Sequence, residues 1–124
     1  MGKSQREKGK RGERELANLL KDHGYNCRRG QQYCGTNGDA DVVGLPGIHI
    51  ECKRVERLNL EDAMTQAIDD TAAEKLPFGE EIYPAVFHRR NRGSWLVTMR
   101  LDDWMNLYRE WGSGRPVSYT HLTL

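Results

Sequence analysis

The spacing of apolar positions divides most of the chain into helical and extended segments. Apolar residues recur at helical intervals over residues 16–20, and Gly24 can end such a segment, so a first helix is predicted from about Lys10 to His23. The clearest amphipathic pattern spans residues 60–74, behind Asn59 as a candidate N-cap. Two well-defined helices are therefore expected in the first three quarters of the chain.

Runs rich in β-branched and aromatic residues lie between and after these helices. They are followed by LDDWMNLYREW, residues 101–111, a third helical segment whose apolar face is expected to cover the sheet. The order α-β-β-β-α-β-β-α predicts an α/β fold with a central mixed sheet of about five strands flanked by helices. The predicted strands are residues 25–29, 40–45, 48–53, 82–88 and 94–99.

The segment GDADVVGLPGIHIECKR, residues 38–54, carries more charge than a buried hairpin needs. Alternate residues of a strand point to the same face, so His49, Glu51 and Lys53 share one face and the apolar residues between them share the other. Two interpretations are open at this point. The charges form a site, or they belong to an exposed edge strand whose Lys and Glu prevent pairing with another sheet.

The turn of this hairpin decides where its other carboxylates lie. A three-residue loop at residues 45–47 places Asp41 opposite Glu51 and Asp39 opposite Lys53. A two-residue loop would place Asp41 on the apolar face at an electrostatic cost, so we predict the first register. Carboxylates facing each other about 5 Å apart repel unless a cation lies between them, and Mg²⁺ is a cation that takes carboxylate, water and phosphate oxygens. Lys53 could then orient or help deprotonate a metal-bound water.

Composition narrows the class of protein. A chain of 124 residues with 37% hydrophobic and 30% charged residues suits one globular domain and not a disordered chain. It has no apolar run of about 20 residues and no apolar stretch typical of a secretory signal, so a cytoplasmic protein without membrane attachment is expected. The three cysteines have irregular spacing and are expected to be reduced thiols without zinc.

Charge is unevenly distributed along the chain. Residues 1–57 carry twelve Lys and Arg against eight Asp and Glu, residues 58–81 carry one against seven, and residues 82–124 carry six against three; the net charges are +4, −6 and +3. Such runs can be ordinary solvated faces. Basic segments around a carboxylate cluster would also hold a phosphodiester backbone near a metal.

The hairpin and the first helix together resemble a known family. Asp41, followed after nine residues by Glu51-Cys52-Lys53, resembles the D…ExK signature of the PD-(D/E)XK nuclease superfamily. The stretch GERELANLLKDHGY, residues 12–25, resembles the opening of the archaeal-type Holliday junction resolvases and their phage relatives, in which a helix glutamate completes the metal site. The resemblance covers residues 10 to about 72 and implies a restriction-endonuclease-like fold.

Carried over by position, the resemblance implies that Glu13, Asp41, Glu51 and Lys53 are catalytic. Glu15 competes for the helix position, but counting back from Gly24-Tyr25 favours Glu13. Ala40 stands where the signature has proline, and Asp39 is an extra carboxylate that could support the site. Gln66 resembles a glutamine found near the active site of several relatives, or is an exposed helix residue. His49 could touch the site or pack within the domain.

The resemblance also implies the cofactor and the ligands. One or two Mg²⁺ ions, for which Mn²⁺ could substitute, would bind Asp41, Glu51, the main-chain carbonyl of Cys52 and Glu13, directly or through water. Water would then attack in line and leave a 5′-phosphate on the product.

The basic residues predict a DNA partner, bound through phosphates without sequence reading. The expected activity is a structure-selective endonuclease, of the Holliday junction resolvase kind and acting as a homodimer on branched DNA. The alternatives are another nuclease of nicking, repair or restriction type, or a non-catalytic DNA-binding accessory protein. The predicted DNA contacts are Lys3, Arg6, Lys8, Lys10, Arg11, Arg28, Arg29, Arg54 and Arg57.

The domain organisation expected from these patterns has three parts. Residues 1–9 are polar and basic and are expected to form a flexible arm. Residues 10–112 would form a single nuclease domain. Residues 113–124 would be a tail, non-native from about residue 117, because VSYTHLTL looks like translated vector sequence.

Overall fold

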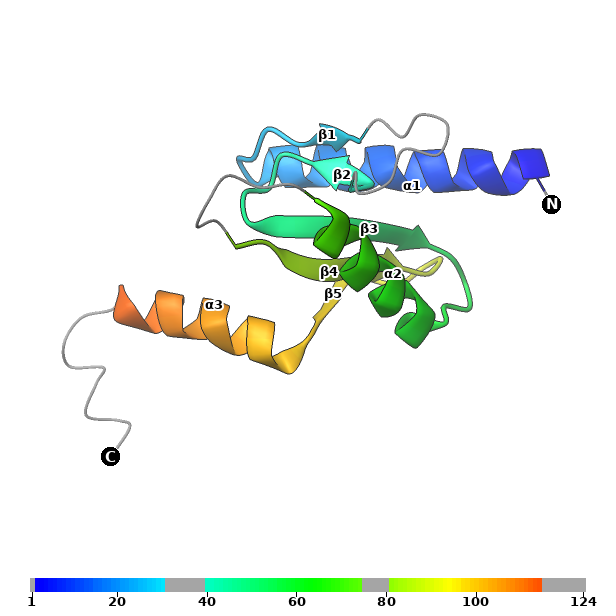
Figure 1. The fold of residues 1–124 in the computed structure, drawn as a ribbon. Helices are drawn as coiled ribbons and strands as arrows, with labels where there is room; N and C mark the ends of the chain where they lie inside the picture. Colours follow the sequence, from blue (N-terminus) through cyan, green and yellow to red (C-terminus); the bar gives the residue numbers. More distant parts are fainter. Residues whose placement is uncertain (1, 31–39, 75–80, 115–124) are drawn as a thin grey trace.

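The computed structural model of the chain describes residues 2–30, 40–74 and 81–114, with side chains from residue 6 onward. Five strands form one sheet in the order β1-β2-β3-β4-β5, and the predicted order of helices and strands is confirmed (Figure 1). Only β3 and β4 are parallel neighbours within this sheet, so the sheet is mixed as predicted. The elements are α1 (Gly2–Asp22), β1 (Arg28–Arg29), β2 (Val42–Val43), β3 (Ile48–Arg54), α2 (Leu60–Ala73), β4 (Tyr83–Arg89), β5 (Leu96–Met99) and α3 (Leu101–Ser113).

The helix α1 packs on one face of the sheet through its apolar stripe. Leu16 and Ala17 are buried there against Ile50 and Cys52 of β3 and Phe87 of β4. Burial of side chains as large as those of Leu16, Ile50 and Phe87 stabilises a fold by about 1.5–3 kcal/mol each. This face is the main core of the domain and fixes α1 against β3.

The helix α2 covers the opposite face of the central strands. Its Ala63 and Ala67 are buried with Val86 of β4, and Leu58 packs beside them. The helix begins as predicted, because the side chain of Asn59 accepts a hydrogen bond of 3.1 Å from the backbone N–H of Asp62. Small residues on α2 let it lie close to the sheet, so β3 is covered on both faces.

The β2–β3 hairpin has the predicted register. Val42 pairs with Ile50, and the backbone N–H of Asp41 donates to the carbonyl of Ile50 at 2.9 Å. Residues 45–47 form the loop, in which Gly47 takes a positive φ of 83° that glycine adopts without steric cost. This register places Asp41 opposite Glu51; Asp39 lies outside the described residues.

The N-terminal helix is longer than predicted, and the first two strands are shorter. Helix α1 begins at Gly2, so the segment expected to be a flexible arm is helical instead. Its Lys, Arg, Gln and Glu residues are good helix formers and extend the helix without needing apolar contacts. Strands β1 and β2 have two residues each, because pairing at that edge is limited to the register of Arg28 with Val43 and Arg29 with Val42.

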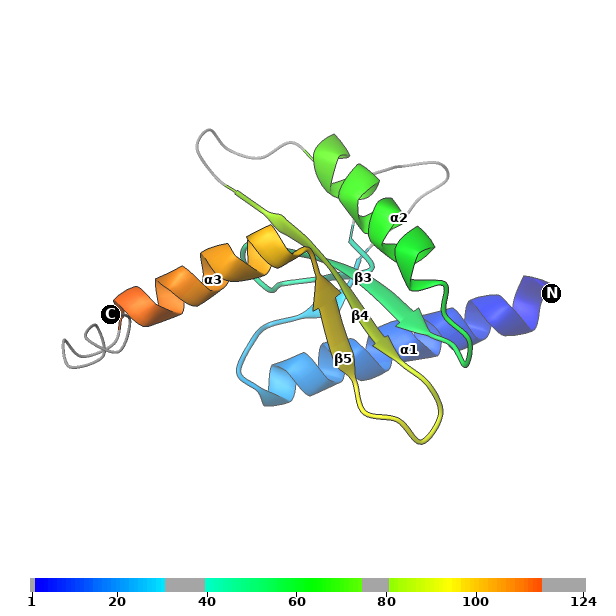
Figure 2. The same ribbon diagram turned by 90° about the horizontal axis from the view of Figure 1, so that it is seen from below.

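The third helix does not cover the sheet, which corrects the expectation for residues 101–111. No side chain of α3 is buried by the described residues, and the helix extends away from the sheet in both views (Figures 1 and 2). Only Arg100 separates β5 from α3, and one residue is too short a connection to bring the helix back over the sheet. Helix α3 therefore presents its aromatic residues outward.

Cys27 and Cys52 are free buried thiols of the core, and burial raises the pKa of both. Cys34 lies outside the described residues. Within the described ranges, no helix is both long enough and apolar enough to cross a membrane. The tail predicted to be non-native from about residue 117 also lies outside the described structure.

Candidate active site

A cavity of about 550 Å³ opens at the end of β3 where α1 and α2 approach the hairpin. Its walls come from four parts of the chain that are far apart in sequence. The four residues predicted to be catalytic all line it, and so does Gln66. The lining residues are Lys8, Gly9, Glu13, Asp41, Glu51, Cys52, Lys53, Arg54, Val55, Glu56 and Gln66.

Asp41 and Glu51 form the buried acidic centre of this cavity. Their relative exposures are 9% and 2%, and one oxygen of Asp41 accepts a hydrogen bond of 2.8 Å from the backbone N–H of Cys52. Burial and the neighbouring charge of Asp41 together raise the pKa of Glu51 to about 8, although the charge of Lys53 acts in the opposite direction. At neutral pH this pair therefore needs a shared proton or a cation.

Lys53 lies on the cavity side of β3, next to Glu51. Its Nζ is 3.6 Å from Oε2 of Glu51 and donates to Oε1 of Gln66 at 3.3 Å. Gln66 thus reaches β3 from α2 and holds the ammonium group in place. The side chain of Lys53 is 29% exposed, so its charge remains accessible from the cavity.

Glu13 enters the cavity from α1. Burial raises the pKa of its carboxyl group, the hydrogen bond from Arg29 opposes that rise, and the charge of Asp41 adds to it. The Nε of Arg29 donates to Oε1 of Glu13 at 2.9 Å. Arg29, predicted to contact DNA, is therefore engaged by a carboxylate in this structure.

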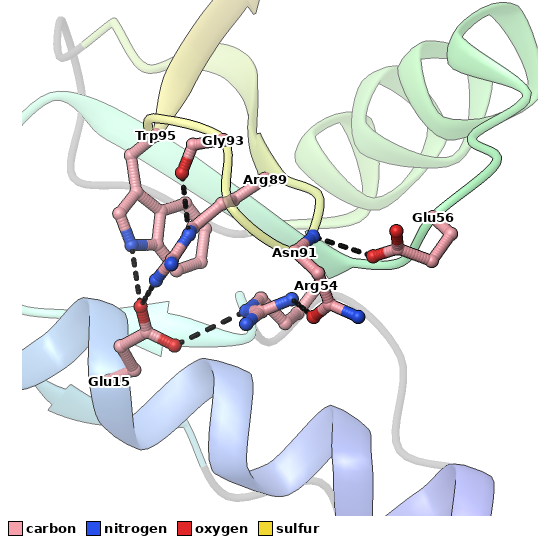
Figure 3. A network of polar contacts seen from close by, with 7 residues as sticks. All are labelled: Glu15, Arg54, Glu56, Arg89, Asn91, Gly93 and Trp95. Atoms are coloured by element: carbon pink, nitrogen blue, oxygen red, sulfur yellow. Dashed lines mark hydrogen bonds and ion pairs between the residues drawn. The ribbon is translucent and has the colours of Figure 1, made fainter.

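Glu15, two residues further along α1, points to a different part of the molecule. Its carboxylate accepts hydrogen bonds from Arg54 at 3.3 Å and from Nε1 of Trp95 at 3.1 Å, and it also pairs with Arg89 (Figure 3). These partners lie at the ends of β3 and β4 and in the following loop. The network ties α1 to the sheet, which distinguishes Glu15 from Glu13.

The same network orders the loop after β4. Nη1 of Arg54 donates to the side chain of Asn91 at 2.8 Å, and the backbone N–H of Asn91 donates to Glu56 at 2.6 Å (Figure 3). Gly12 allows α1 to approach at this point, because a Cβ there would lie 2.5 Å from the Cβ of Arg54. Arg54, predicted to contact DNA, is thus held between a carboxylate and an amide at the rim of the cavity.

The remaining predicted DNA contacts differ in position. Lys8 lines the cavity, while most of the others are exposed. The side chain of Lys3 is not among those that the structure describes. The exposed residues of this set are Arg6, Lys10, Arg11, Arg28 and Arg57.

His49 does not line the cavity. It is completely buried between β3 and α2, where its Nδ1 contacts the carboxylate of Glu74. Asp70, on the same helix, contributes to the raised pKa of Glu51. The sequence interpretation missed Asp70 and Glu74, although their spacing of four and eight residues from Gln66 places all three on one side of a helix.

Two buried carboxylates, a lysine two residues after one of them, and a glutamate from the first helix lie around one cavity, an arrangement that resembles the PD-(D/E)XK signature. The sequence model of a family described as "Phage putative PDDEXK endonuclease" matches residues 4–124, and the chain belongs to this family. A search of curated proteins finds no match.

The fold is also found in a solved structure, that of Hjc, a Holliday junction resolvase from the archaeal hyperthermophile Archaeoglobus fulgidus. The two chains superpose with a TM-score of 0.52 at 24% sequence identity, over 74% of this chain and 72% of Hjc. This similarity confirms the restriction-endonuclease-like fold that the sequence predicted.

Proposed function

We propose that the chain is a Mg²⁺-dependent, structure-selective DNA endonuclease that acts as a Holliday junction resolvase. The observation that supports this most directly is that Glu13, Asp41, Glu51 and Lys53 line one cavity although they come from three separate elements. The Hjc-like fold supports the junction as substrate.

The residues present fit a hard divalent cation. Asp41 and Glu51 offer buried carboxylate oxygens, and the raised pKa of Glu51 supports a cation or a proton between them. The main-chain carbonyl of Cys52 and the carboxylate of Glu13 would complete the ligand set. When bound, Mg²⁺ supplies a Lewis acid and a water molecule of lowered pKa.

Lys53 would act on the attacking water and on the phosphorus centre. Its ammonium group lies beside Glu51 and is steadied by Gln66, so it can orient the water and offset negative charge as it develops on the phosphate. The hydrogen bond from Arg29 would hold the carboxylate of Glu13 in its orientation. The scissile phosphate would be attacked in line, leaving a 5′-phosphate.

Basic residues near the cavity would hold the DNA backbone. Lys8 lies in the cavity wall, and Lys10 and Arg11 follow it on the exposed side of α1. Contacts of this kind position a duplex without reading its sequence. They favour selection by DNA shape.

We further propose a homodimer formed through α3. Cutting two strands symmetrically across a junction requires two sites related by a two-fold axis. Trp104, Tyr108 and Trp111 stack along the exposed side of α3, with ring centroids 5.1 and 5.6 Å apart. These exposed rings make an apolar surface on α3 that is suited to a second copy.

One cleavage assay tests the proposal against its alternatives. The purified chain is offered a four-way junction, a nicked duplex, a flap and a linear duplex, each with Mg²⁺ and with EDTA. Symmetric cutting of the junction only with metal supports a resolvase, whereas cutting of another substrate supports a nicking, repair or restriction-type enzyme. Binding without cleavage under every metal tried would identify an accessory protein and refute the enzymatic proposal.

A further inference from the structure

A row of polar residues on α2, continued by Glu74 at its C-cap, lies against the row of polar residues on β3. Lys53 contacts Gln66, Glu51 interacts with Asp70, and His49 contacts Glu74. This matching follows from geometry, because four residues of a helix rise about 6 Å and two residues of a strand about 6.6 Å. The two rows therefore remain in step over three successive pairs.

The middle pair brings together two carboxylates under the cover of α2. Glu51 is 2% exposed, and Asp70 is half-buried. A ligand atom from each of Glu51, Asp70 and His49 lies within 4.8 Å of the others. Ligands of one cation lie at most about 4.4 Å apart, because metal–oxygen and metal–nitrogen bonds measure about 2.0–2.2 Å. Small side-chain movements would thus bring all three onto one ion.

His49 has one ring nitrogen left for such an ion. Its Nδ1 contacts the carboxylate of Glu74, an acceptor that favours the proton on Nδ1 and leaves a lone pair on Nε2. His49 is fully buried, and Nε2 has no hydrogen-bond partner among the described residues. A buried nitrogen without a partner is costly, and metal-binding histidines commonly donate their other N–H to a carboxylate in this way.

We propose that His49, Glu51 and Asp70 form a binding site for a divalent transition-metal ion, with Mn²⁺ as its representative. The imidazole nitrogen favours a transition metal over Mg²⁺, while the two carboxylates suit a cation as hard as Mn²⁺. The site lies on the α2 side of Glu51, and the proposed catalytic ion lies on the Asp41 side. Glu51 would therefore be shared, but His49 and Asp70 are outside the catalytic set, so this inference stands apart from the proposed function.

Electron spin echo envelope modulation of Mn²⁺ bound to the full chain tests this site directly, because it detects a coordinated imidazole nitrogen. Nitrogen modulation is expected in the wild-type chain, and it should persist when a large excess of Mg²⁺ is added. It is also expected in the Asp41→Asn variant. It should be lost in His49→Gln and retained in His88→Gln, the matched control. Absence of modulation in the wild type, or its persistence in His49→Gln, would overturn the proposal.

A second measurement covers the case in which His49→Gln does not fold. Asp70→Asn is a milder change at a partly exposed position, and it should weaken Mn²⁺ binding at the nitrogen-containing site at least tenfold in a titration. Glu74→Gln should weaken it about 10–100-fold, since it removes only the support of the imidazole. Unchanged affinity in both variants would refute the site.

These outcomes are independent of junction cleavage. If the chain cuts no DNA but shows nitrogen modulation, the proposed function fails and the metal site stands. If Asp41→Asn abolishes cleavage and the wild type shows no nitrogen modulation, the proposed function stands and the metal site fails.

Discussion

Asp41 lies opposite Glu51 in the β2–β3 hairpin, and both carboxylates are buried in the wall of the cavity. Burial, the charge of Asp41 and a side-chain hydrogen bond between the two carboxyl groups all contribute to the raised pKa of Glu51. The free energy of unfolding of the chain should therefore depend on pH and on bound metal.

The metal-free chain is expected to lose stability as pH rises. A carboxyl group whose pKa is higher in the folded state than in the unfolded state stabilises the fold below its unfolded pKa of 4.5, and this contribution is lost as pH rises through about 8. The melting temperature in EDTA should therefore fall between about pH 5 and about pH 9. Mg²⁺ should raise it most at the upper end, where the carboxylates are free to bind.

Asp41→Asn supplies the control for this pH dependence. The amide removes the neighbouring negative charge, so the fall in melting temperature with pH should become shallower and the effect of Mg²⁺ smaller. An equal pH dependence in wild type and variant would show that the Asp41–Glu51 pair is not its source.

Loss of Asp41 or Lys53 should abolish cleavage without abolishing DNA binding. Asp41→Asn removes a proposed metal ligand, and Lys53→Ala removes the ammonium group beside Glu51; each is expected to lower the cleavage rate at least about 100-fold. Single-turnover cleavage and a gel-shift titration on the same junction measure the two properties. Lys21→Ala, at the exposed C-terminal end of α1, is the control expected to cut normally. A variant that binds and cuts like the wild type would remove its residue from the proposed mechanism.

Glu13 and Glu15 offer a matched test on one helix. Glu13→Gln should lower the cleavage rate while the free energy of unfolding changes little. Glu15→Gln should lower the free energy of unfolding by about 1–3 kcal/mol, because it weakens contacts with Arg54, Arg89 and Trp95, while folded protein keeps its cleavage rate. Urea unfolding and single-turnover cleavage separate the two effects. The opposite pattern would exchange the roles assigned to these residues.

The parts of the fold that the sequence predicts are those set by local pattern. The N-cap at Asn59 and the hairpin register follow from a capping side chain and from the cost of placing Asp41 among apolar residues. The position of α3 does not follow from local pattern, because an apolar helix face does not specify which surface will cover it. The pairing of α2 with β3 could not be predicted either, since it depends on how α2 is rotated about its axis. The ties of Glu15 to Arg89 and Trp95 span more than 70 residues of sequence and depend on the complete sheet.

The exposed basic side of α1 should control the salt dependence of DNA binding. Replacing both Lys10 and Arg11 with Gln is expected to weaken binding to every DNA shape to a similar extent. A plot of the logarithm of affinity against the logarithm of salt concentration should also become less steep, by about 1–2 in slope. Each phosphate contact that is lost means about one counterion fewer released on binding. Lys21→Gln, at the exposed C-terminal end of the same helix, is the matched control. A loss confined to the junction would mean that these residues select shape and do not simply hold the backbone.

The exposed aromatic side chains of α3 should set the oligomeric state. Replacing Trp104 and Tyr108 with Ala removes two stacked aromatic side chains that are 46% and 43% exposed. Because neither is buried within the chain, the change should leave the free energy of unfolding of the monomer nearly unaltered while shifting the dimer to monomer in multi-angle light scattering. On junction DNA the variant should leave single nicks in place of paired cuts, since two linked sites are needed for symmetric cleavage. A wild-type chain that is monomeric both free and bound to a junction would refute this role for α3.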